Sequence, residues 1–434
     1  MTEIVTKESK LLGEKYHTFV HKSGLRVFVA PKKMTSSYAL FATKYGSIDN
    51  KFKLDSDKEF TSVPDGIAHF LEHKMFECEN GEDAFELFAR TGASANAYTS
   101  NEKTAYLFSA TDNFYESLEY LLDFVTHPYF TEQTVQKEQG IIGQELRMYD
   151  DHPGARLEKG LLQALYKDNK VRIDIGGTIE SIAQINAEIL YKCYNTFYNL
   201  HNMVLAVSGD IEVDKVIEIC DKVLKDAPKQ TIVRDYECEN EPKEVYQKRS
   251  VCELAVAKPI LAIGIKDSDI SNDPNERAKK FYAISILNEM LFSRSGGLYD
   301  TLYEKKLISH SLGYSFQNTK YYSINEITAE SQDPEAVYSH FVEFIEQTKK
   351  QGLDRELFEL AKRTTYAVYI RSFDSTDDVA ESLVSNYLEE TDMFDMVDII
   401  KSIDYDYVSR LFNEFYKEEY YAMSVVNPIS KESE

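Results

Sequence analysis

The sequence has few cysteines and a shortage of basic residues. Its five cysteines, at positions 78, 193, 220, 238 and 252, are odd in number, scattered and without any C-x-x-C pair. This usage predicts a reducing compartment, the cytoplasm, and argues against a disulfide framework. The 49 lysines and arginines are outnumbered by 73 aspartates and glutamates, which gives a net charge of −24. Because nucleic-acid binding requires clustered basic residues, we expect no nucleic-acid partner.

Long hydrophobic runs are also lacking. No apolar run approaches the ~20 residues of a membrane-spanning helix, so we expect no membrane span. The segment 1–7 lacks the basic and apolar regions of a signal peptide. The chain of 434 residues is nevertheless 43% hydrophobic, which is enough for sizeable cores. Its length predicts two domains of roughly 200 residues each.

The most informative feature that is present is H-x-x-E-H at residues 69–73. At about 100° per residue, His69, Glu72 and His73 fall within one sector of a helix, so both imidazoles can reach the same ion. Neutral imidazole is a favoured zinc ligand, and a hydrolytic zinc site keeps one position for water. Glu72 is placed to take a proton from that water, and this residue order is the inverzincin signature. The alternative is a core helix with two hydrogen-bonded histidines.

Two histidines leave such a site one protein ligand short. Before the motif, Asp65 is the predicted N-cap of its helix. Further along, Glu138 and Glu145 lie seven residues apart (145 − 138) in a second predicted helix. Seven residues are about two turns, so both carboxylates project from the same side. Either one could bind zinc while the other supports the site, or both could simply be solvated.

The chain resembles the pitrilysin/insulinase family of inverzincin metallopeptidases, and within it the YmfH-type predicted zinc proteases of Gram-positive bacteria. The resemblance rests on three segments: GIAHFLEHKMFE (66–77), GASANAYTS (92–100) and EQGIIGQE (138–145). It implies one Zn²⁺ per chain, with His69, His73 and Glu145 as its ligands. It also implies two catalytic carboxylates, Glu72 as the base and Glu138 in a supporting role.

The resemblance further implies a strand that binds the peptide substrate. An extended peptide would pair with the edge strand 94–99, whose predicted substrate-binding residues are Ser94, Ala95, Asn96 and Ala97. Independently, residues 97–99 and 104–108 have the composition of strands joined by the polar turn 100–103. Adding a strand to a sheet edge uses main-chain hydrogen bonds and therefore tolerates many peptide sequences. The alternative is an ordinary hairpin.

The sequence also contains an internal repeat. Residues 185–198 align without gaps onto residues 403–416, an offset of 218 (403 − 185). Each copy is a predicted amphipathic helix that precedes an apolar strand. At this offset the positions of His69 and His73 are taken by Leu287 and Leu291, so the second half is predicted to lack the metal site.

These patterns predict an α+β protein of two homologous α/β-sandwich domains. The expected catalytic zinc domain is 1–225, the polar stretch 226–250 is the expected linker, and 251–434 is the expected C-terminal domain without metal. The family resemblance implies that two such domains face each other across a cleft and form half of a four-domain clamshell. We therefore expect a dimer, either of this chain or with a related family subunit, that encloses a peptide substrate.

One segment of the second half departs from the family. Many relatives carry L-x-x-L-R-E-K-R-G-L-A-Y there, and aligning it with residues 298–310 puts Tyr303 and His310 at the arginine and tyrosine positions. Both are predicted to bind substrate by hydrogen bonds, but without a fixed cation. Each lost donor to a developing oxyanion costs roughly 3–4 kcal/mol. The alternative is helix packing by the tyrosine beside a surface histidine, and nothing assigns a role to the nearby Arg294.

The expected function is that of a zinc-dependent endopeptidase, which cleaves peptides or small unfolded polypeptides bound as an added edge strand. The alternative is a non-catalytic or partner-dependent peptide-binding or scaffold subunit of a heterodimeric processing peptidase. The intact Glu72 favours the enzyme, because a purely structural zinc site needs no base.

Overall fold

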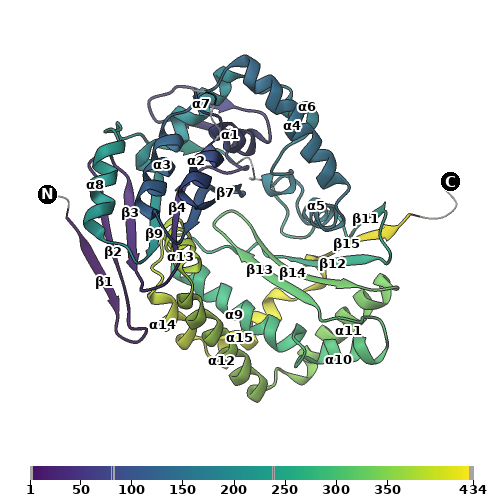
Figure 1. Cartoon of the computed structure of the whole chain (residues 1–434). Coiled ribbons are helices and arrows are strands. Elements are labelled where there is room, and N and C mark those ends of the chain that lie inside the picture. The colour runs from purple at the N-terminus through teal and green to yellow at the C-terminus, as the bar shows by residue number, and fades with distance from the viewer. Residues whose placement is uncertain (1–2, 80, 82–83, 237, 239, 430–434) are drawn as a thin grey trace. The chain divides into compact units, whose positions relative to one another are not determined.

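A computed structural model describes residues 3–79, 81, 84–236, 238 and 240–429. The chain divides into two compact units that each combine helices with a principal sheet (Figure 1). This confirms the predicted α+β class with two domains. The ranges are Met1–Leu146, Asp174–Tyr236 and Ile370–Phe394 for unit 1, and Arg147–Ile173, Glu237–Tyr369 and Asp395–Glu434 for unit 2.

The described residues of unit 1 form a sheet in the order β1-β2-β3-β9-β4-β8-β7, in which only β3 and β9 run parallel. Its strands are β1 (Val5–Ser9), β2 (Glu14–Val20), β3 (Arg26–Pro31), β4 (Ser37–Thr43), β7 (Ser94–Thr99), β8 (Thr104–Ala110) and β9 (Met203–Gly209). Strands β4 and β9 are buried along their whole length, because they are apolar runs at the centre of the sheet. A smaller sheet joins β10 (Ile232–Arg234), β5 (Lys51–Leu54) and β6 (Thr61–Ser62).

Helices complete unit 1. They are α1 (Ile67–Met75), α2 (Ala84–Thr91), α3 (Phe114–Thr126), most of α4 (Glu132–Asp150), α6 (Ile179–Ile182), α7 (Ala187–Phe197), α8 (Val213–Val223) and α13 (Thr376–Leu388). One large core fills the space between the sheet and helices such as α1, α3 and α7, and it includes Phe41, Phe70, Tyr106 and Leu205. Helix α13 packs against β4 and β9.

Unit 2 repeats the order of five of these strands, β3-β9-β4-β8-β7, without counterparts of β1 and β2 among its described residues. Its sheet runs β11-β15-β12-β14-β13, and β11 and β15 are parallel as β3 and β9 are. The strands are β11 (Arg249–Leu254), β12 (Ile260–Lys266), β13 (Gly313–Asn318), β14 (Ser323–Glu330) and β15 (Tyr421–Pro428). The helices are α5 (Pro153–Leu165), α9 (Pro274–Phe292), α10 (Gly297–Glu304), α11 (Pro334–Gln351), α12 (Arg355–Arg371, of which the last two residues count with unit 1), α14 (Asp395–Ser402) and α15 (Tyr405–Phe415).

The repeat predicted from the sequence corresponds to equivalent elements. Helices α7 and α15 begin 218 residues apart (405 − 187), and edge strands β7 and β13 begin 219 apart (313 − 94). Even a buried polar contact recurs, since the hydroxyls of Tyr106 and Tyr198 lie 2.7 Å apart in unit 1. At the corresponding place in unit 2, Asn325 donates a hydrogen bond of 3.2 Å to Tyr416.

The compact units differ from the predicted ranges 1–225 and 251–434 in two segments. Residues 147–173 count with unit 2, because α5 packs on β11, β12 and β15. Its approach is close at Gly160, where a Cβ atom would lie 2.7 Å from both Ser250 Oγ and Ser424 Oγ. Residues 370–394 count with unit 1, because α13 packs on that sheet. Such crossings leave no trace in local composition.

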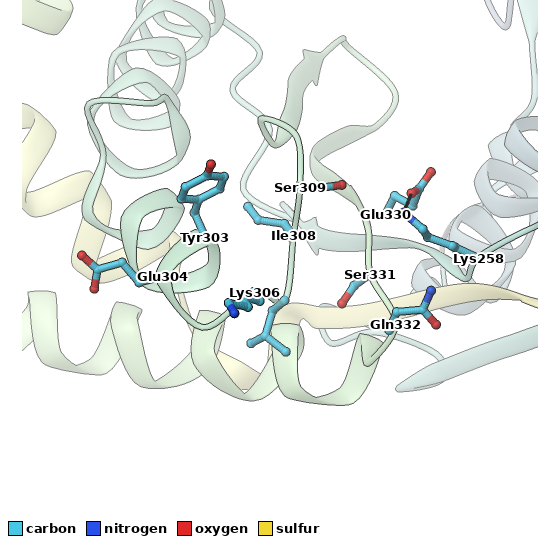
Figure 2. A pocket seen from close by; sticks show the side chains of 10 residues that line it. Lys258, Tyr303, Glu304, Lys306, Ile308, Ser309, Glu330, Ser331 and Gln332 are labelled. Atoms are coloured by element: carbon cyan, nitrogen blue, oxygen red, sulfur yellow. Dashed lines mark hydrogen bonds and ion pairs between the residues drawn. The ribbon is translucent and has the colours of Figure 1, made fainter.

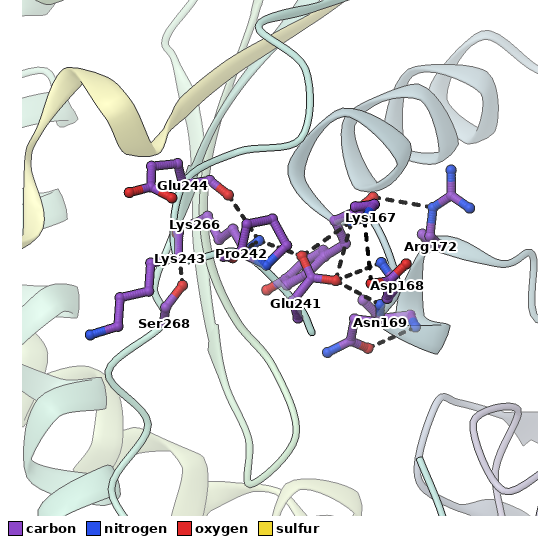
Figure 3. Close-up of polar contacts among 12 residues, drawn as sticks. Lys167, Asp168, Asn169, Arg172, Glu241, Pro242, Lys243, Glu244, Lys266 and Ser268 are labelled. Atoms are coloured by element: carbon purple, nitrogen blue, oxygen red, sulfur yellow. Dashed lines mark hydrogen bonds and ion pairs between the residues drawn. The ribbon is translucent and has the colours of Figure 1, made fainter. Parts of the chain in front are cut away.

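The stretch 226–250, predicted as a linker from its polarity, contains ordered structure. Strand β10 pairs with β5, and Glu241 anchors the chain within unit 2 (Figure 3). Its carboxylate accepts hydrogen bonds from the backbone N–H groups of Asp168 (2.6 Å) and Asn169 (2.8 Å) and from Lys266 Nζ (2.5 Å). Burial alone would raise the pKa of Glu241, but these donors outweigh it and lower the pKa.

In the part of the chain that is described, no helix is long and apolar enough to span a bilayer.

The Glu241 anchor can be tested by removing one charge at a time. We expect Glu241→Ala to lower the free energy of unfolding by about 3 kcal/mol, because the buried Lys266 ammonium loses its counter-charge. Combining it with Lys266→Met removes both charges and should recover most of the loss. Urea denaturation followed by circular dichroism measures both. A loss below about 1 kcal/mol for the single variant would contradict a buried anchor.

Candidate metal centre and substrate strand

Helix α1 starts in a tight packing arrangement rather than with a capping side chain. The predicted N-cap Asp65 is wrong: Gly66 is the N-cap residue, in the left-handed conformation at φ 89°, with no side-chain cap. A Cβ atom at Gly66 would lie 2.3 Å from the carbonyl oxygen of Gly176, so only glycine fits. Asp65 instead accepts a 2.6 Å hydrogen bond from Asn50, and its backbone carbonyl accepts one from Ser181.

The apolar positions of α1 hold the motif residues in place. The buried apolar residues are Ile67, Ala68, Phe70, Leu71 and Met75, and all belong to the core of unit 1. This periodicity leaves His69, Glu72 and His73 together on the remaining sector of the helix, as the sequence predicts. The imidazole rings of His69 and His73 lie 4.6 Å apart, centroid to centroid.

Helix α4 brings the two carboxylates to the same place. It is buried through Val135, Ile142 and Leu146, and Gln139 ties it down by donating a 2.9 Å hydrogen bond to the carbonyl of Ile185. The facing carboxylates belong to Glu138 and Glu145, whose side chains are 13% and 22% exposed. The expectation that both project from one side is therefore confirmed.

The two carboxylates contact different atoms of the histidines. Glu145 Oε2 lies 3.4 Å from Nε2 of His73 and 3.8 Å from Nε2 of His69. Glu138 Oε1 lies 3.1 Å from the other ring nitrogen of His73, Nδ1. The geometry thus gives the two carboxylates different places. Glu145 converges with the Nε2 atoms of both histidines, whereas Glu138 contacts the opposite nitrogen of the His73 ring and orients that ring.

The converging set fits a zinc ion. The candidate ligand atoms of His69, His73 and Glu145 all lie within 4.8 Å of one another. Glu145 Oε2 is buried, and no residue in the described ranges donates a hydrogen bond to it, so a cation would satisfy it. Two imidazole nitrogens and one carboxylate oxygen form a donor set typical of catalytic zinc. A cation bound by these three side chains would give the buried Glu145 Oε2 the partner that it lacks among the described residues.

Glu72 is held by strand β7. Its Oε2 accepts a 2.6 Å hydrogen bond from Thr99 Oγ1, at the end of β7. Burial raises the pKa of Glu72, while the Thr99 hydrogen bond and the charge of His73 oppose that shift. A carboxylate with a raised pKa is a stronger base, which suits proton transfer from water. Sequence reasoning assigned Thr99 only to the strand, because the contact joins residues 27 positions apart.

The edge strand is present where the sequence predicts it. In the described residues β7 pairs only with β8, in antiparallel register from Ser94 opposite Ser109 to Thr99 opposite Thr104. The outer edge of β7 therefore has main-chain groups open to a further strand. The backbone N–H of Ala97 donates to the side chain of its neighbour Asn96 at 2.9 Å. Peptide binding along this edge stays a prediction.

Unit 2 carries apolar residues at the equivalent positions. Leu287 and Leu291, both buried, replace the histidines at the offset of 218. Lys362 donates to the carbonyl of Ile403 just as Gln139 does to Ile185, which sets the offset between α4 and α12 at 223 (362 − 139). Glu138 and Glu145 then correspond to Ala361 and Val368 (138 + 223 and 145 + 223). In the described part of unit 2 no metal-ligand cluster occurs.

The predicted substrate residues Tyr303 and His310 belong to unit 2. Tyr303 is 54% exposed, stacks on Tyr299 with ring centroids 5.6 Å apart, and lines a pocket of about 520 Å³ (Figure 2). His310 is exposed in the loop that follows the pocket residue Ser309. Arg294 is exposed as well. A role of these side chains in substrate binding stays a prediction.

The backbone conformation of residue 306 suggests a second alignment of the family segment with residues 298–310. Lys306, just after α10, has φ 58°, the left-handed conformation that favours glycine after a helix. If the glycine of the family segment is placed on Lys306, its arginine falls on Leu302 and its tyrosine on Ser309. Leu302 is fully buried. In either alignment the segment supplies no arginine at that place.

Two family descriptions match the chain: "Insulinase (Peptidase family M16)" over residues 61–179 and "Peptidase M16 inactive domain" over residues 184–365. The uncharacterized zinc protease YmfH of Bacillus subtilis (strain 168) is 37% identical over 397 residues, covering 90% of this chain and 92% of that protein. The crystal structure of an M16-like peptidase from Alicyclobacillus acidocaldarius matches with a TM-score of 0.91 and 31% identity, covering 98% of this chain and 100% of that one. The mitochondrial-processing peptidase subunit beta of Caenorhabditis elegans is 30% identical over 161 residues, which are 36% of this chain and 35% of that protein.

The chain therefore belongs to peptidase family M16, the insulinase family. This confirms the resemblance drawn from residues 66–77, 92–100 and 138–145. Relatives such as YmfH are named zinc proteases, and the His-His-Glu cluster described above lies within the range that the insulinase description matches.

The two histidines differ in their pKa values, and therefore in how strongly protons compete with a metal for their ring nitrogens. Burial and the charge of His73 lower the pKa of His69 to about 4. Burial also lowers the pKa of His73, but Glu138, Glu145 and Glu72 outweigh it and raise that pKa above the ordinary 6.5. Near neutral pH His69 is therefore already neutral, and His73 is the imidazole that must lose a proton before it can bind a metal.

This difference predicts the pH dependence of zinc binding. As the pH rises from about 5 to about 6.5, log Kd for zinc should fall by about one per pH unit, because one proton leaves His73 and none leaves His69. Competition with a chromophoric chelator at several pH values measures the slope. In Glu138→Gln the pKa of His73 falls, so the loss of affinity on acidification should begin at lower pH. A slope of about two would contradict the assignment of His69 as neutral.

Proposed function

We propose that this protein is a zinc-dependent endopeptidase that cleaves peptides or small unfolded polypeptides. The observation that carries the proposal is the convergence of His69, His73 and Glu145 beside Glu72, which a hydrogen bond from Thr99 fixes in place. A metal site with a purely structural role has no use for a buried carboxylate poised beside its ligands.

Each residue of the site has a distinct task in this proposal. Zinc, when bound by His69, His73 and Glu145, supplies Lewis-acid polarisation of the scissile carbonyl and acidifies water. Glu72 takes the proton from the attacking water and delivers it to the leaving amine. Glu138 fixes the ring of His73 through Nδ1, at 3.1 Å, and so keeps Nε2 directed toward the carboxylate of Glu145. Thr99 keeps the Glu72 carboxylate turned toward the substrate strand.

The substrate would lie along β7. Main-chain hydrogen bonds to the open edge of Ser94–Thr99 would hold an extended peptide without regard to its sequence. Thr99 ends this strand and contacts Glu72, so a peptide aligned on the edge passes directly by the base. We also infer a cytoplasmic location, because none of the five cysteines forms a disulfide.

Glu72→Gln tests the enzyme directly. The variant should bind zinc as tightly as the wild type, because the side chain at position 72 lies outside the ligand set, yet its kcat should fall by about 10²–10⁴-fold. Zinc content and cleavage of a mixed peptide library are the measurements. The exposed Glu86→Gln on α2 serves as the matched control and should retain full activity. A wild type that holds zinc but cleaves no peptide, alone or with a partner, would refute the enzyme.

A second pair of variants separates the two carboxylates of α4. Glu145→Ala should weaken zinc binding by at least about 100-fold, because it removes the third ligand. Glu138→Ala should keep zinc within about 10- to 100-fold of the wild-type affinity and lower kcat, because it only frees the ring of His73. Calorimetric zinc titration beside peptide kinetics measures both. The reverse ranking would exchange the two assigned roles.

A partner-dependent subunit is the second candidate, and one observation favours it. Neither alignment of the segment 298–310 supplies the arginine that many family members carry there. In the first alignment its position is taken by Tyr303. Among the relatives, one is named as a subunit of a processing peptidase. In this version a related chain that retains the arginine and tyrosine would complete the site, and this chain would supply the zinc.

Activity of the isolated chain distinguishes the two versions. The heterodimer version predicts that the purified chain gains at least about 100-fold in kcat/KM when its partner, co-purified from the native cell, is restored. Full activity of the single chain would refute it. In the homodimer version the isolated chain is active, and activity should fall in Tyr303→Phe and His310→Ala.

A further inference from the structure

Two neighbouring residues at the end of β7 are held from opposite faces of the sheet. Thr99 donates a hydrogen bond to Glu72 of α1 (2.6 Å), and Tyr98 donates one to Glu381 of α13 (2.8 Å). Successive residues of a strand point to opposite faces, so α1 and α13 contact the same strand from its two sides. The last two residues of β7 are therefore each held by a helix, one on either face of the sheet.

Glu381 is the centre of a larger cluster on its face. Its carboxylate lies 3.3 Å from Lys103 Nζ, in the turn between β7 and β8, and 3.5 Å from the hydroxyl of Tyr38 in β4. Lys103 also donates to Ser385, one turn further along α13, and its ammonium lies 5.4 Å from the Tyr98 ring centre. Through Tyr98 and Lys103, these contacts join β7 and the β7–β8 turn to α13. Through Tyr38, they also join α13 to β4, which pairs with β8.

The helix that carries Glu381 is itself firmly placed. Helix α13 packs against β4 and β9 in the centre of the sheet, where Figure 1 shows it beside these strands. The ring of Tyr387 lies 5.6 Å from that of Phe28 in β3. Residues of α13 such as Val379 and Leu383 are buried. The carboxylate of Glu381 is therefore held in place by a packed helix and can in turn position the edge strand β7.

Both tyrosines of the cluster act as donors. Burial and then the charge of Glu381 raise the pKa values of Tyr98 and Tyr38 well above the ordinary value of 10.0. The phenols stay protonated across the physiological range, and the hydrogen bonds to Glu381 persist. A hydrogen bond to an ionised carboxylate is stronger than one between neutral groups.

We propose that Glu381 is a positioning residue for the peptidase reaction: by holding Tyr98 it sets the edge of β7 on which the peptide is aligned. The proposal rests on the proposed function, in that β7 must bind peptide. It also gives the segment 370–394, far along the chain from the metal motif, a part in substrate binding. The simpler interpretation of Glu381, a stabilising contact between helix and sheet, predicts lower stability but unchanged peptide affinity.

Peptide kinetics separate these two interpretations. We expect Glu381→Ala to raise KM for a quenched fluorescent β-casein peptide about 5- to 20-fold, while kcat changes by less than about threefold. Glu381→Gln keeps an acceptor for Tyr98 and should stay within about threefold of the wild-type KM. Asp378→Asn, an exposed carboxylate on the first turn of the same helix, is the matched control and should leave KM unchanged.

A double variant shows whether Glu381 acts through Tyr98. Tyr98→Phe should raise KM about as much as Glu381→Ala, and the combined variant should be no worse than either alone. Additive effects would overturn the proposal. So would a Glu381→Gln variant as damaged as Glu381→Ala, since that would place the effect in the charge and not in the position of the tyrosine.

Hydrogen exchange keeps this inference separate from the proposed function. Amides of residues 94–99 should lose at least about tenfold of their protection in Glu381→Ala, while those of β9 keep theirs. Binding of a fluorescein-labelled β-casein peptide to the Glu72→Gln background should weaken in parallel. If the wild type binds and cleaves no peptide, the proposed function fails, and the exchange rates still decide whether Glu381 holds the strand. Unchanged exchange at residues 94–99 would overturn the inference.

Discussion

The arrangement depends on one convergence: the Nε2 atoms of His69 and His73 meet the carboxylate of Glu145, 3.8 and 3.4 Å away. The three side chains come from two helices, and neither helix could hold a metal alone. The apolar faces of both helices belong to the same core, so hydrophobic packing supplies the energy that places the three candidate ligands. The polar side chains face one another on the sectors that the apolar faces of the two helices leave free.

The duplicated architecture shows what the metal site requires beyond the fold. Five strands have the same order in both units, and a polar contact between Tyr106 and Tyr198 has its counterpart between Asn325 and Tyr416. Yet Leu287 and Leu291 take the histidine positions and are buried. The fold tolerates either chemistry at these positions, because a helix needs only one apolar face to pack. Function therefore resides in a few side chains that a shared scaffold presents.

Much of the site could be predicted from the sequence because its parts obey local periodicities. The sector shared by residues 69, 72 and 73 and the two-turn spacing of Glu138 and Glu145 follow from helix geometry alone. The choice between those two carboxylates did not follow, since it depends on which nitrogen of His73 each one meets. The predicted N-cap was wrong because the close approach of Gly176 to Gly66 is a contact between distant segments. The contacts of Thr99 and Glu381, and the crossing of residues 147–173 and 370–394 between units, are non-local for the same reason.

Zinc K-edge absorption spectroscopy of the purified chain tests the central claim most directly. The account predicts one zinc per chain, with two imidazole nitrogens at about 2.0–2.1 Å and oxygen ligands at about 2.0–2.2 Å. Removing one imidazole in His73→Ala should reduce the histidine multiple-scattering signal or abolish zinc binding altogether. A sulfur ligand at about 2.3 Å, or a wild-type chain that takes up no zinc, would contradict the account.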